Sequence, residues 1–75
     1  MKVTLGEKIR NLREDADMTQ TDLAQKTNMT QRKISYMEND RYEPSIEDLR
    51  AICLHFGISA DYLLDLPQNL PFPQK

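Results

Sequence analysis

Five serines or threonines stand where a segment of helical periodicity begins, and they constrain the fold more than any other feature of the sequence. They are Thr4, Thr19, Thr30, Ser45 and Ser59. A hydroxyl at this position accepts a backbone N–H of the first turn that has no partner within the helix. No stretch of five or more residues alternates between apolar and polar side chains as a strand would. The pattern predicts an all-α fold with helices at about residues 4–16, 20–27, 31–38, 46–56 and 60–65.

Within these segments, apolar residues recur every three or four positions. Two such series are Leu5, Ile9, Leu12 and Ala16, and Ile46, Leu49, Cys53 and Phe56. Acids three residues after a cap complete capping-box patterns at Glu7, Asp22 and Asp48. The expected ends fall at Asp17, Asn28, Asp40 and Gly57. Glycine, asparagine and aspartate are the residues that best tolerate the left-handed backbone of a helix end.

Several classes of protein are excluded or disfavoured. The longest apolar run is Ala51–Leu54, too short for a transmembrane helix or a secretory signal. The single cysteine, Cys53, forms no internal disulfide, and a metal site built from it and the single histidine, His55, is disfavoured. No phosphate-binding glycine loop and no Ser-His-Asp set is present. We expect a cytoplasmic domain that is not an enzyme and has no cofactor, metal, membrane or small-molecule site.

The second and third segments form a candidate helix-turn-helix. They are joined by residues 27–30, and Ala24 is small enough to let the two helices approach closely. Ile34 and Met37 are expected to point inward, which leaves Gln31, Arg32, Ser35 and Tyr36 on the exposed face of the third segment. Glutamine can bind adenine and arginine can bind guanine, while serine accepts several partners. These four residues are the predicted base-reading set.

Charge placement singles out the same helix. The other four segments carry an acid in the first turn, as the helix dipole favours, whereas the third begins with Gln31, Arg32 and Lys33. A polyanion at this end would explain the exception, and Lys33 is therefore a candidate phosphate ligand. The alternative is that both cations belong to a solvated face. Arg41, in the following loop, could clamp a backbone phosphate.

The chain resembles the phage-repressor or Cro-type helix-turn-helix family, often called the Xre family. Matching residues run from Leu5 to Leu66 and include Leu5-Gly6-Glu7-Lys8-Ile9-Arg10, Met18-Thr19-Gln20, Leu23-Ala24, Ile34-Ser35, Glu38-Asn39, Pro44-Ser45 and Phe56-Gly57-Ile58-Ser59. The resemblance implies a compact five-helix, lambda-repressor-like domain whose third helix enters the major groove. It also implies a sequence-specific regulator of transcription, a repressor, that binds a pseudo-palindromic operator as a homodimer on the bacterial or phage nucleoid.

The resemblance implies roles for individual residues as well. Phosphate or backbone contacts fall on Gln20, Thr30, Asn39 and Arg41, and base reading on Gln31, Arg32 and Tyr36. Arg13 and Glu38 match a structural ion pair. The family usually has glycine where this chain has Asp17, Asn28 and Asp40, and Asp40 places a negative charge beside the expected phosphate path.

Charge leaves a second function open. With 10 basic and 12 acidic residues the net charge is −2, whereas nucleic-acid-binding domains are commonly basic. The alternative is a protein–protein module of the antitoxin or anti-repressor type. However, residues 30–37 carry two cations and no acid, so the acidity is concentrated elsewhere.

The expected domain covers residues 1–66, and residues 67–75 form a proline-rich tail or linker. Leu70 and Phe72 in this tail could dock on a partner subunit. If the protein dimerises, Leu63, Leu64, Leu66 and the tail are the expected surface.

Overall fold

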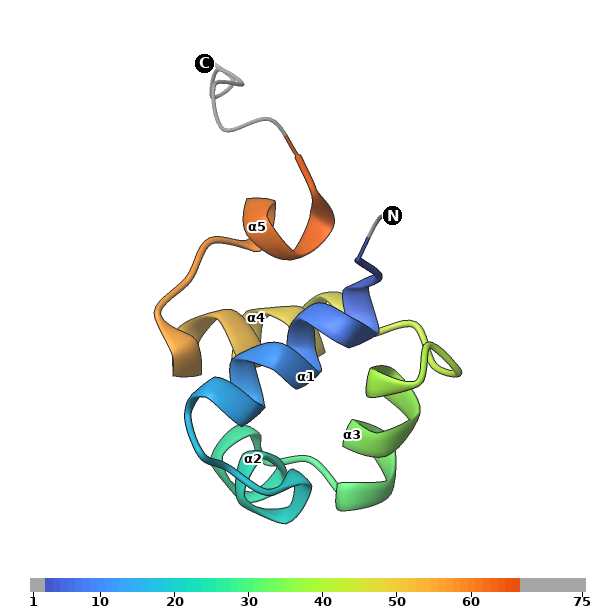
Figure 1. The fold of residues 1–75 in the computed structure, drawn as a ribbon, viewed down its shortest axis with the longest axis vertical. Helices are drawn as coiled ribbons and strands as arrows, with labels where there is room; N and C mark the ends of the chain where they lie inside the picture. The colour runs from blue at the N-terminus through green and yellow to red at the C-terminus, as the bar shows by residue number, and fades with distance from the viewer. Residues whose placement is uncertain (1–2, 67–75) are drawn as a thin grey trace.

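The computed structural model describes residues 3–66, and within them it contains five α-helices and no strand (Figure 1). The helices are α1 (Leu5–Asp15), α2 (Gln20–Thr27), α3 (Gln31–Glu38), α4 (Ile46–Phe56) and α5 (Ala60–Leu64). The predicted all-α fold is confirmed. The predicted bounds differ from the observed ones by one residue at each end of α1 and by one residue at the end of α5, which stops at Leu64 because Asp65 adopts the left-handed conformation (φ 61°). The predicted tail at residues 67–75 lies outside the described residues.

Every predicted N-cap is present. Each Ser or Thr oxygen accepts a backbone N–H from the first turn of its helix. The capping boxes of α1, α2 and α4 are complete, although two use aspartate: Asp22 Oδ2 accepts from Thr19 N at 3.0 Å, and Asp48 Oδ2 accepts from Ser45 N at 3.0 Å. The predicted left-handed ends at Asp17, Asn28, Asp40 and Gly57 are also confirmed. These local signals therefore fixed the helix boundaries closely.

The core lies where α3 packs against α1 and α2, with α4 and α5 closing the other side (Figure 1). Its buried apolar residues are Ile9, Leu23, Ala24, Ile34, Met37, Ile52 and Leu63. In the apolar series of α4, the first member, Ile46, is 78% exposed. The buried face of α4 instead runs through Asp48 and Ile52, which lie four positions apart. Ala16, the last member of the first series, is also exposed.

Two further features bear on the site. Gly6 of α1 is buried against the end of α3, where Asp40 Oδ1 accepts its backbone N–H at 3.0 Å. Lys8 joins α1 to α5, because its Nζ donates to Tyr62 O at 3.0 Å and pairs with Asp65 at 3.1 Å. Among residues 3–66, no helix has the length and apolar character needed to cross a membrane.

Candidate nucleic-acid interface

A tight corner joins α2 to α3. Asn28 adopts the left-handed conformation (φ 59°), and Met29 N donates back to Ala24 O at 2.8 Å. Ala24 is only 4% exposed, so its small side chain lies at the contact between the helices. Thr27 is buried and satisfies its hydroxyl by donating to Leu23 O at 2.7 Å. The predicted helix-turn-helix geometry is therefore present, and hydrogen bonds close its turn.

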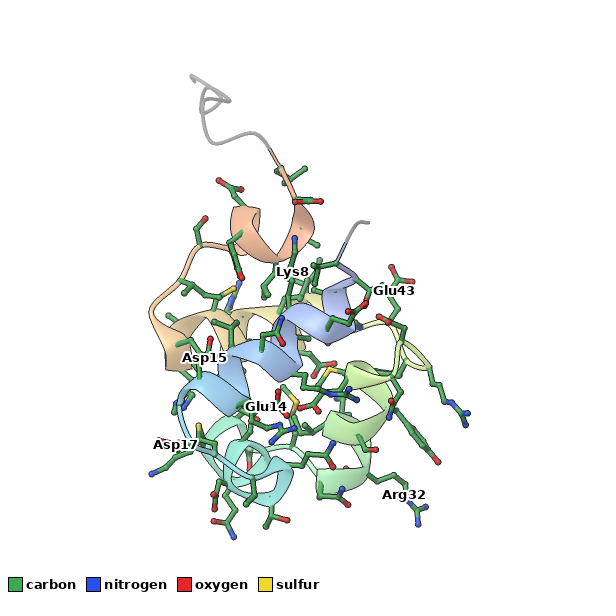
Figure 2. All side chains as sticks on the ribbon, viewed as in Figure 1. Lys8, Glu14, Asp15, Asp17, Arg32 and Glu43 are labelled. Atoms are coloured by element: carbon green, nitrogen blue, oxygen red, sulfur yellow. The ribbon has the colours of Figure 1, made fainter. Side chains whose placement is uncertain are left out.

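The outer face of α3 is open to solvent. Ile34 and Met37 are buried, as predicted, whereas Arg32 and Tyr36 are exposed and Ser35 is half-buried. Arg32 extends away from the ribbon (Figure 2) and makes no ion pair or hydrogen bond within the described residues. With about 100° of rotation per residue, Gln31 and Lys33 lie on opposite flanks of this face. Gln31 therefore borders α2, and Lys33 borders α4.

Gln31 is held on its flank by a chain of hydrogen bonds. Its Nε2 donates to Gln20 Oε1 at 2.6 Å, and Gln20 Nε2 donates to Glu38 Oε1 at 3.1 Å. An ionised carboxylate only accepts hydrogen bonds, so Gln20 turns its amide nitrogen toward Glu38 and its carbonyl oxygen toward Gln31. Gln31 must in turn direct its nitrogen to Gln20. Its carbonyl oxygen and second N–H are left for a ligand.

Glu38 is the buried centre of this polar network, and its side chain has no exposed area. Arg13 Nε donates to Glu38 Oε2 at 2.6 Å and Arg13 Nη2 donates to Oε1 at 3.0 Å. Arg10 Nε donates to Oε1 at 3.4 Å. Burial raises the pKa of Glu38, but the hydrogen bonds from Arg13, Gln20 and Arg10 lower it more, and the net shift is downward. The buried group is therefore an ionised carboxylate that joins α1, α2 and α3.

Lys33, a predicted phosphate ligand, is paired with a carboxylate of α4. Its Nζ lies 2.8 Å from Asp48 Oδ1 and 5.3 Å from the centre of the Tyr42 ring. The hydrogen bond to Asp48 raises the pKa of Lys33. Asp48 is itself buried and also accepts from Tyr42 Oη at 3.1 Å. The structure therefore uses Lys33 to satisfy a buried carboxylate. Among the described residues, the cations that stay unpaired near α3 are Arg32 and Arg41.

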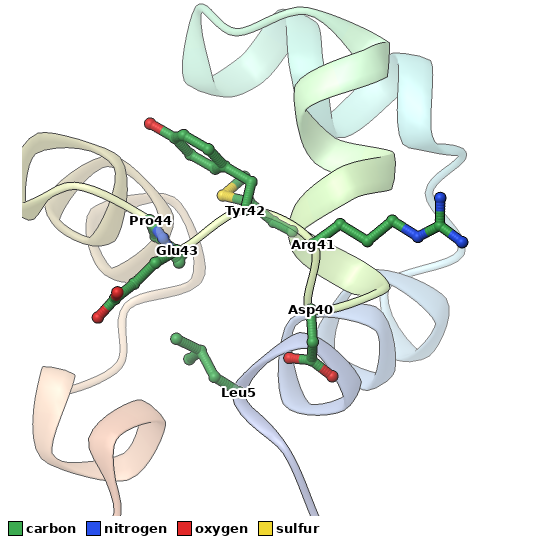
Figure 3. A pocket seen from close by; sticks show the side chains of 7 residues that line it. Leu5, Asp40, Arg41, Tyr42, Glu43 and Pro44 are labelled. Atoms are coloured by element: carbon green, nitrogen blue, oxygen red, sulfur yellow. The ribbon is translucent and has the colours of Figure 1, made fainter.

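The predicted backbone-contacting residues differ in availability. Thr30 Oγ1 accepts from Lys33 N at 3.1 Å, which leaves its hydroxyl hydrogen free. Asn39 is engaged at both ends of its amide: Nδ2 donates to Ser35 O at 2.9 Å and Oδ1 accepts from Arg10 Nη2 at 3.2 Å. Arg41 is exposed and extends into solvent, whereas the nearby Asp40 points toward the start of α1 (Figure 3).

Two hollows flank Arg41. One, of about 360 Å³, is lined by Ser35, Tyr36, Asn39 and Arg41, so it brings together two predicted base-reading residues and two predicted backbone contacts. The other, of about 350 Å³, lies beside the loop from Asp40 to Pro44 against Leu5 (Figure 3). The first hollow adjoins the exposed face of α3 and extends that face toward the loop.

Three residues that bond to the side chains of this site were not predicted from the sequence. Arg10 was not assigned a role, although it lies three residues before Arg13 and therefore on the same side of α1. Tyr42 and Asp48 were not linked to Lys33, because no local pattern relates a loop residue and an N-terminal residue of α4 to a side chain on α3. Among the described residues, no group of three His, Cys, Asp or Glu side chains could hold a metal ion.

Comparison with known proteins gives consistent matches. The Helix-turn-helix family model matches residues 9–63. The immunity repressor protein of Bacillus phage phi105 is 32% identical over 62 residues, which cover 83% of this chain and 43% of the phage protein. The HTH-type transcriptional regulator ImmR of Bacillus subtilis is 31% identical over 62 residues, which cover 83% of this chain and 49% of ImmR. The chain thus spans a little under half the length of these curated relatives.

Solved structures show the same likeness. The P22 c2 repressor protein, crystallised in complex with a synthetic operator, superposes with a TM-score of 0.79 at 31% sequence identity. The match covers 83% of this chain and 94% of that one. The α2–turn–α3 corner and its exposed face therefore occur in a chain similar to a repressor seen with operator DNA.

Proposed function

Because the chain belongs to the Helix-turn-helix family, we propose that it is a sequence-specific, double-stranded-DNA-binding regulator of transcription that acts as a repressor. The observation that carries the proposal is the outer face of α3, where Gln31 is fixed by Gln20 while Arg32 and Tyr36 stay exposed. A preorganised, carboxylate-free helix face of this kind suits the major groove. The protein would act as a binding module rather than an enzyme, on DNA of the bacterial cytoplasm.

The proposed contacts fall into two groups. Gln20, Thr30, Asn39 and Arg41 set the position of the domain on the phosphate backbone, and Gln31, Arg32, Ser35 and Tyr36 meet the base edges. Asn39 belongs to the first group because it lies beside Arg41. Its amide is already bonded to Ser35 O and to Arg10. Lys33 is not proposed as a phosphate ligand. If it bound a phosphate, the buried carboxylate of Asp48 would lose its cationic partner.

Gln31 is proposed to read adenine. Its free carbonyl oxygen and free N–H match the N6 donor and N7 acceptor that adenine shows in the major groove. Gln20 and Glu38 prevent the amide from rotating to the opposite arrangement, which lowers the ordering cost of the contact.

Truncating a base-reading residue should relax specificity. We expect Gln31→Ala and Arg32→Ala each to cost about 1–3 kcal/mol at one base position. Selection of duplexes from a randomised pool, followed by titration of the selected duplex and single-base variants, measures this loss. Gln31→Ala should lose its adenine preference at one position while affinity for random DNA holds. Equal weakening on selected and random duplexes would remove Gln31 from the readout.

Arg41→Ala should behave differently. Removing a residue that contacts only phosphate weakens binding to all sequences alike. The removal should also reduce the slope of log K against log salt by about one unit. Titrations of the selected duplex and a scrambled duplex between about 50 and 200 mM salt provide the measurement. Glu43→Ala, an exposed change in the same loop, serves as the control. An unchanged slope for Arg41→Ala would exclude a phosphate contact.

The operator is proposed to be pseudo-palindromic and to bind two copies of the chain, because a two-fold protein dimer presents two α3 helices to two half-sites. The negative charge of Asp40 beside the expected phosphate path is one argument for the alternative, a protein–protein module. However, Asp40 turns its carboxylate to the N–H of Gly6.

Failure to retard any duplex in gels at about 50 mM salt would overturn the DNA-binding proposal, since non-specific binding alone should be visible there.

A further inference from the structure

One buried carboxylate joins α3, and the loop that follows it, to α4. This carboxylate is Asp48, in the first turn of α4, which is 6% exposed. Lys33, in the first turn of α3, lies with its Nζ 2.8 Å from Asp48 Oδ1. Tyr42, in the loop after α3, donates its hydroxyl to Asp48 Oδ2 at 3.1 Å. The Nζ of Lys33 also lies 5.3 Å from the centre of the Tyr42 ring. These three residues are called the clamp.

Two of the clamp residues directly follow a free cation. Arg32 precedes Lys33 in the first turn of α3, and Arg41 precedes Tyr42 in the loop. Among the described residues, these two arginines are the unpaired cations near α3. We propose that the clamp positions Arg41 relative to Arg32, with Tyr42 as the positioning residue that holds the loop. The proposal rests on the proposed function, which assigns Arg32 to a base edge and Arg41 to a phosphate.

The loop is anchored on both sides of Arg41. On the side of α3, Arg41 N donates to Tyr36 O at 2.8 Å. On the side of α4, the Tyr42 hydroxyl ties the loop to Asp48. Without that hydroxyl the loop would keep its attachment to α3 and lose this attachment to α4. The Arg41 side chain would then sample more positions in the free protein, and ordering it on DNA would cost more.

The anchored loop also keeps Arg41 apart from the acids beside it. Asp40 points toward the start of α1, where it accepts from Gly6 N at 3.0 Å. Glu43 points to the side of the loop opposite Arg41 (Figure 3). In a loosened loop, Arg41 could pair with Glu43, two positions away, and it would have to give up that partner to bind a phosphate. The clamp therefore keeps the guanidinium of Arg41 available to a ligand.

Tyr42→Phe tests the proposal by removing only the hydroxyl whose hydrogen bond Asp48 accepts. Asp48 keeps the Lys33 ammonium and the Ser45 N–H as partners, so the domain should stay folded. We expect the variant to bind the selected and the scrambled duplex about three- to tenfold more weakly, which is the contribution of one hydrogen bond. In an Arg41→Ala background the same change should have no effect, because the side chain that it positions is gone.

Tyr62→Phe is the matched control. It removes a phenolic hydroxyl from an exposed side chain of α5, a helix outside the α2–turn–α3 corner. This variant should bind both duplexes like the wild type.

Amide hydrogen exchange, measured by NMR on the free protein, tests the clamp without DNA. In Tyr42→Phe, the Arg41 N–H should exchange about three- to tenfold faster, because its hydrogen bond to Tyr36 O opens more often. The Ile58 N–H is the reference, since it makes a similar bond to Cys53 O, at 3.0 Å, after the end of α4. Its exchange should not change. A general loss of stability would speed the exchange of both amides.

Three results would overturn the positioning role. The first is an equal loss of binding with and without the Arg41 side chain, because Tyr42 would then contact DNA itself. The second is binding by Tyr42→Phe that matches the wild type, whatever the exchange rates. The third is faster exchange of the Arg41 and Ile58 amides alike.

The outcomes also separate this proposal from DNA binding itself. If Arg41→Ala weakens binding while Tyr42→Phe does not, DNA binding stands and the positioning role falls. If the wild type binds no duplex, the DNA-binding proposal fails, and the exchange of the Arg41 N–H alone decides whether Tyr42 holds the loop.

Discussion

Replacing Gly6 with alanine is expected to destabilise the domain by about 2–3 kcal/mol, although alanine is the better helix former by about 1 kcal/mol. A Cβ at this position would lie 2.7 Å from Glu38 O and 2.7 Å from Asp40 Oδ1, and closer still to Met37 O. Two of these atoms belong to the backbone at the end of α3, so they cannot move aside cheaply. The methyl group would therefore force α1 away from α3.

Thermal and urea unfolding followed by circular dichroism measure this effect. For a domain of this size, the expected loss corresponds to a fall in melting temperature of roughly 10–20 °C. Gly57→Ala is the control, because Gly57 has a left-handed backbone (φ +66°) but open space around its Cβ position. It should cost about 1–2 kcal/mol from backbone strain alone. If Gly6→Ala left stability unchanged or raised it, the close approach of α1 and α3 would be disproved.

Arg13→Ala should lower stability by about 3 kcal/mol at neutral pH, because it strips the main cation from a buried carboxylate. Arg13 makes two hydrogen bonds to Glu38 and a third to Met18 O at 2.8 Å. Arg10→Ala is the matched control: Arg10 is 41% exposed and lies 3.4 Å from the same carboxylate, so its removal should cost under about 1 kcal/mol. Equal losses for the two variants would contradict the assignment of Arg13 as the principal partner.

The pH dependence of the Arg13→Ala effect follows from the lowered pKa of Glu38. Its folded-state pKa lies below the ordinary glutamate value of 4.5. The network therefore contributes stability above that pH and loses it as the pH falls through the folded-state pKa. The stability difference between wild type and Arg13→Ala should be largest near about pH 7 and shrink toward about pH 3. A difference that stays constant with pH would show that Arg13 acts through packing alone.

Short-range signals in the sequence predicted the helices well, because the interactions that set a helix boundary span only a few residues. Thr19 and Asp22, for example, lie three positions apart, and the side chain of each accepts a hydrogen bond from the backbone N–H of the other. The exposed face of α3 was predictable for the same reason: once Ile34 and Met37 are inward, helical geometry places Arg32 and Tyr36 outward. Periodicity alone did not show which face of α4 is buried: Asp48 and Ile52 are buried, whereas Ile46 is 78% exposed.

Local patterns thus sufficed to predict the five helices, their caps and ends, and the helix that presents a carboxylate-free face. How the polar and charged side chains of that helix are used depends instead on the packing of the helices. Lys33 pairs with Asp48, 15 positions along the chain, and Gln31 is oriented by Gln20 and Glu38. Gly6 meets Asp40, which is 34 positions away. Such contacts depend on how helices pack rather than on spacing within one helix. Side chains with the same local pattern can therefore either stay free for a ligand or bond to other residues of the domain.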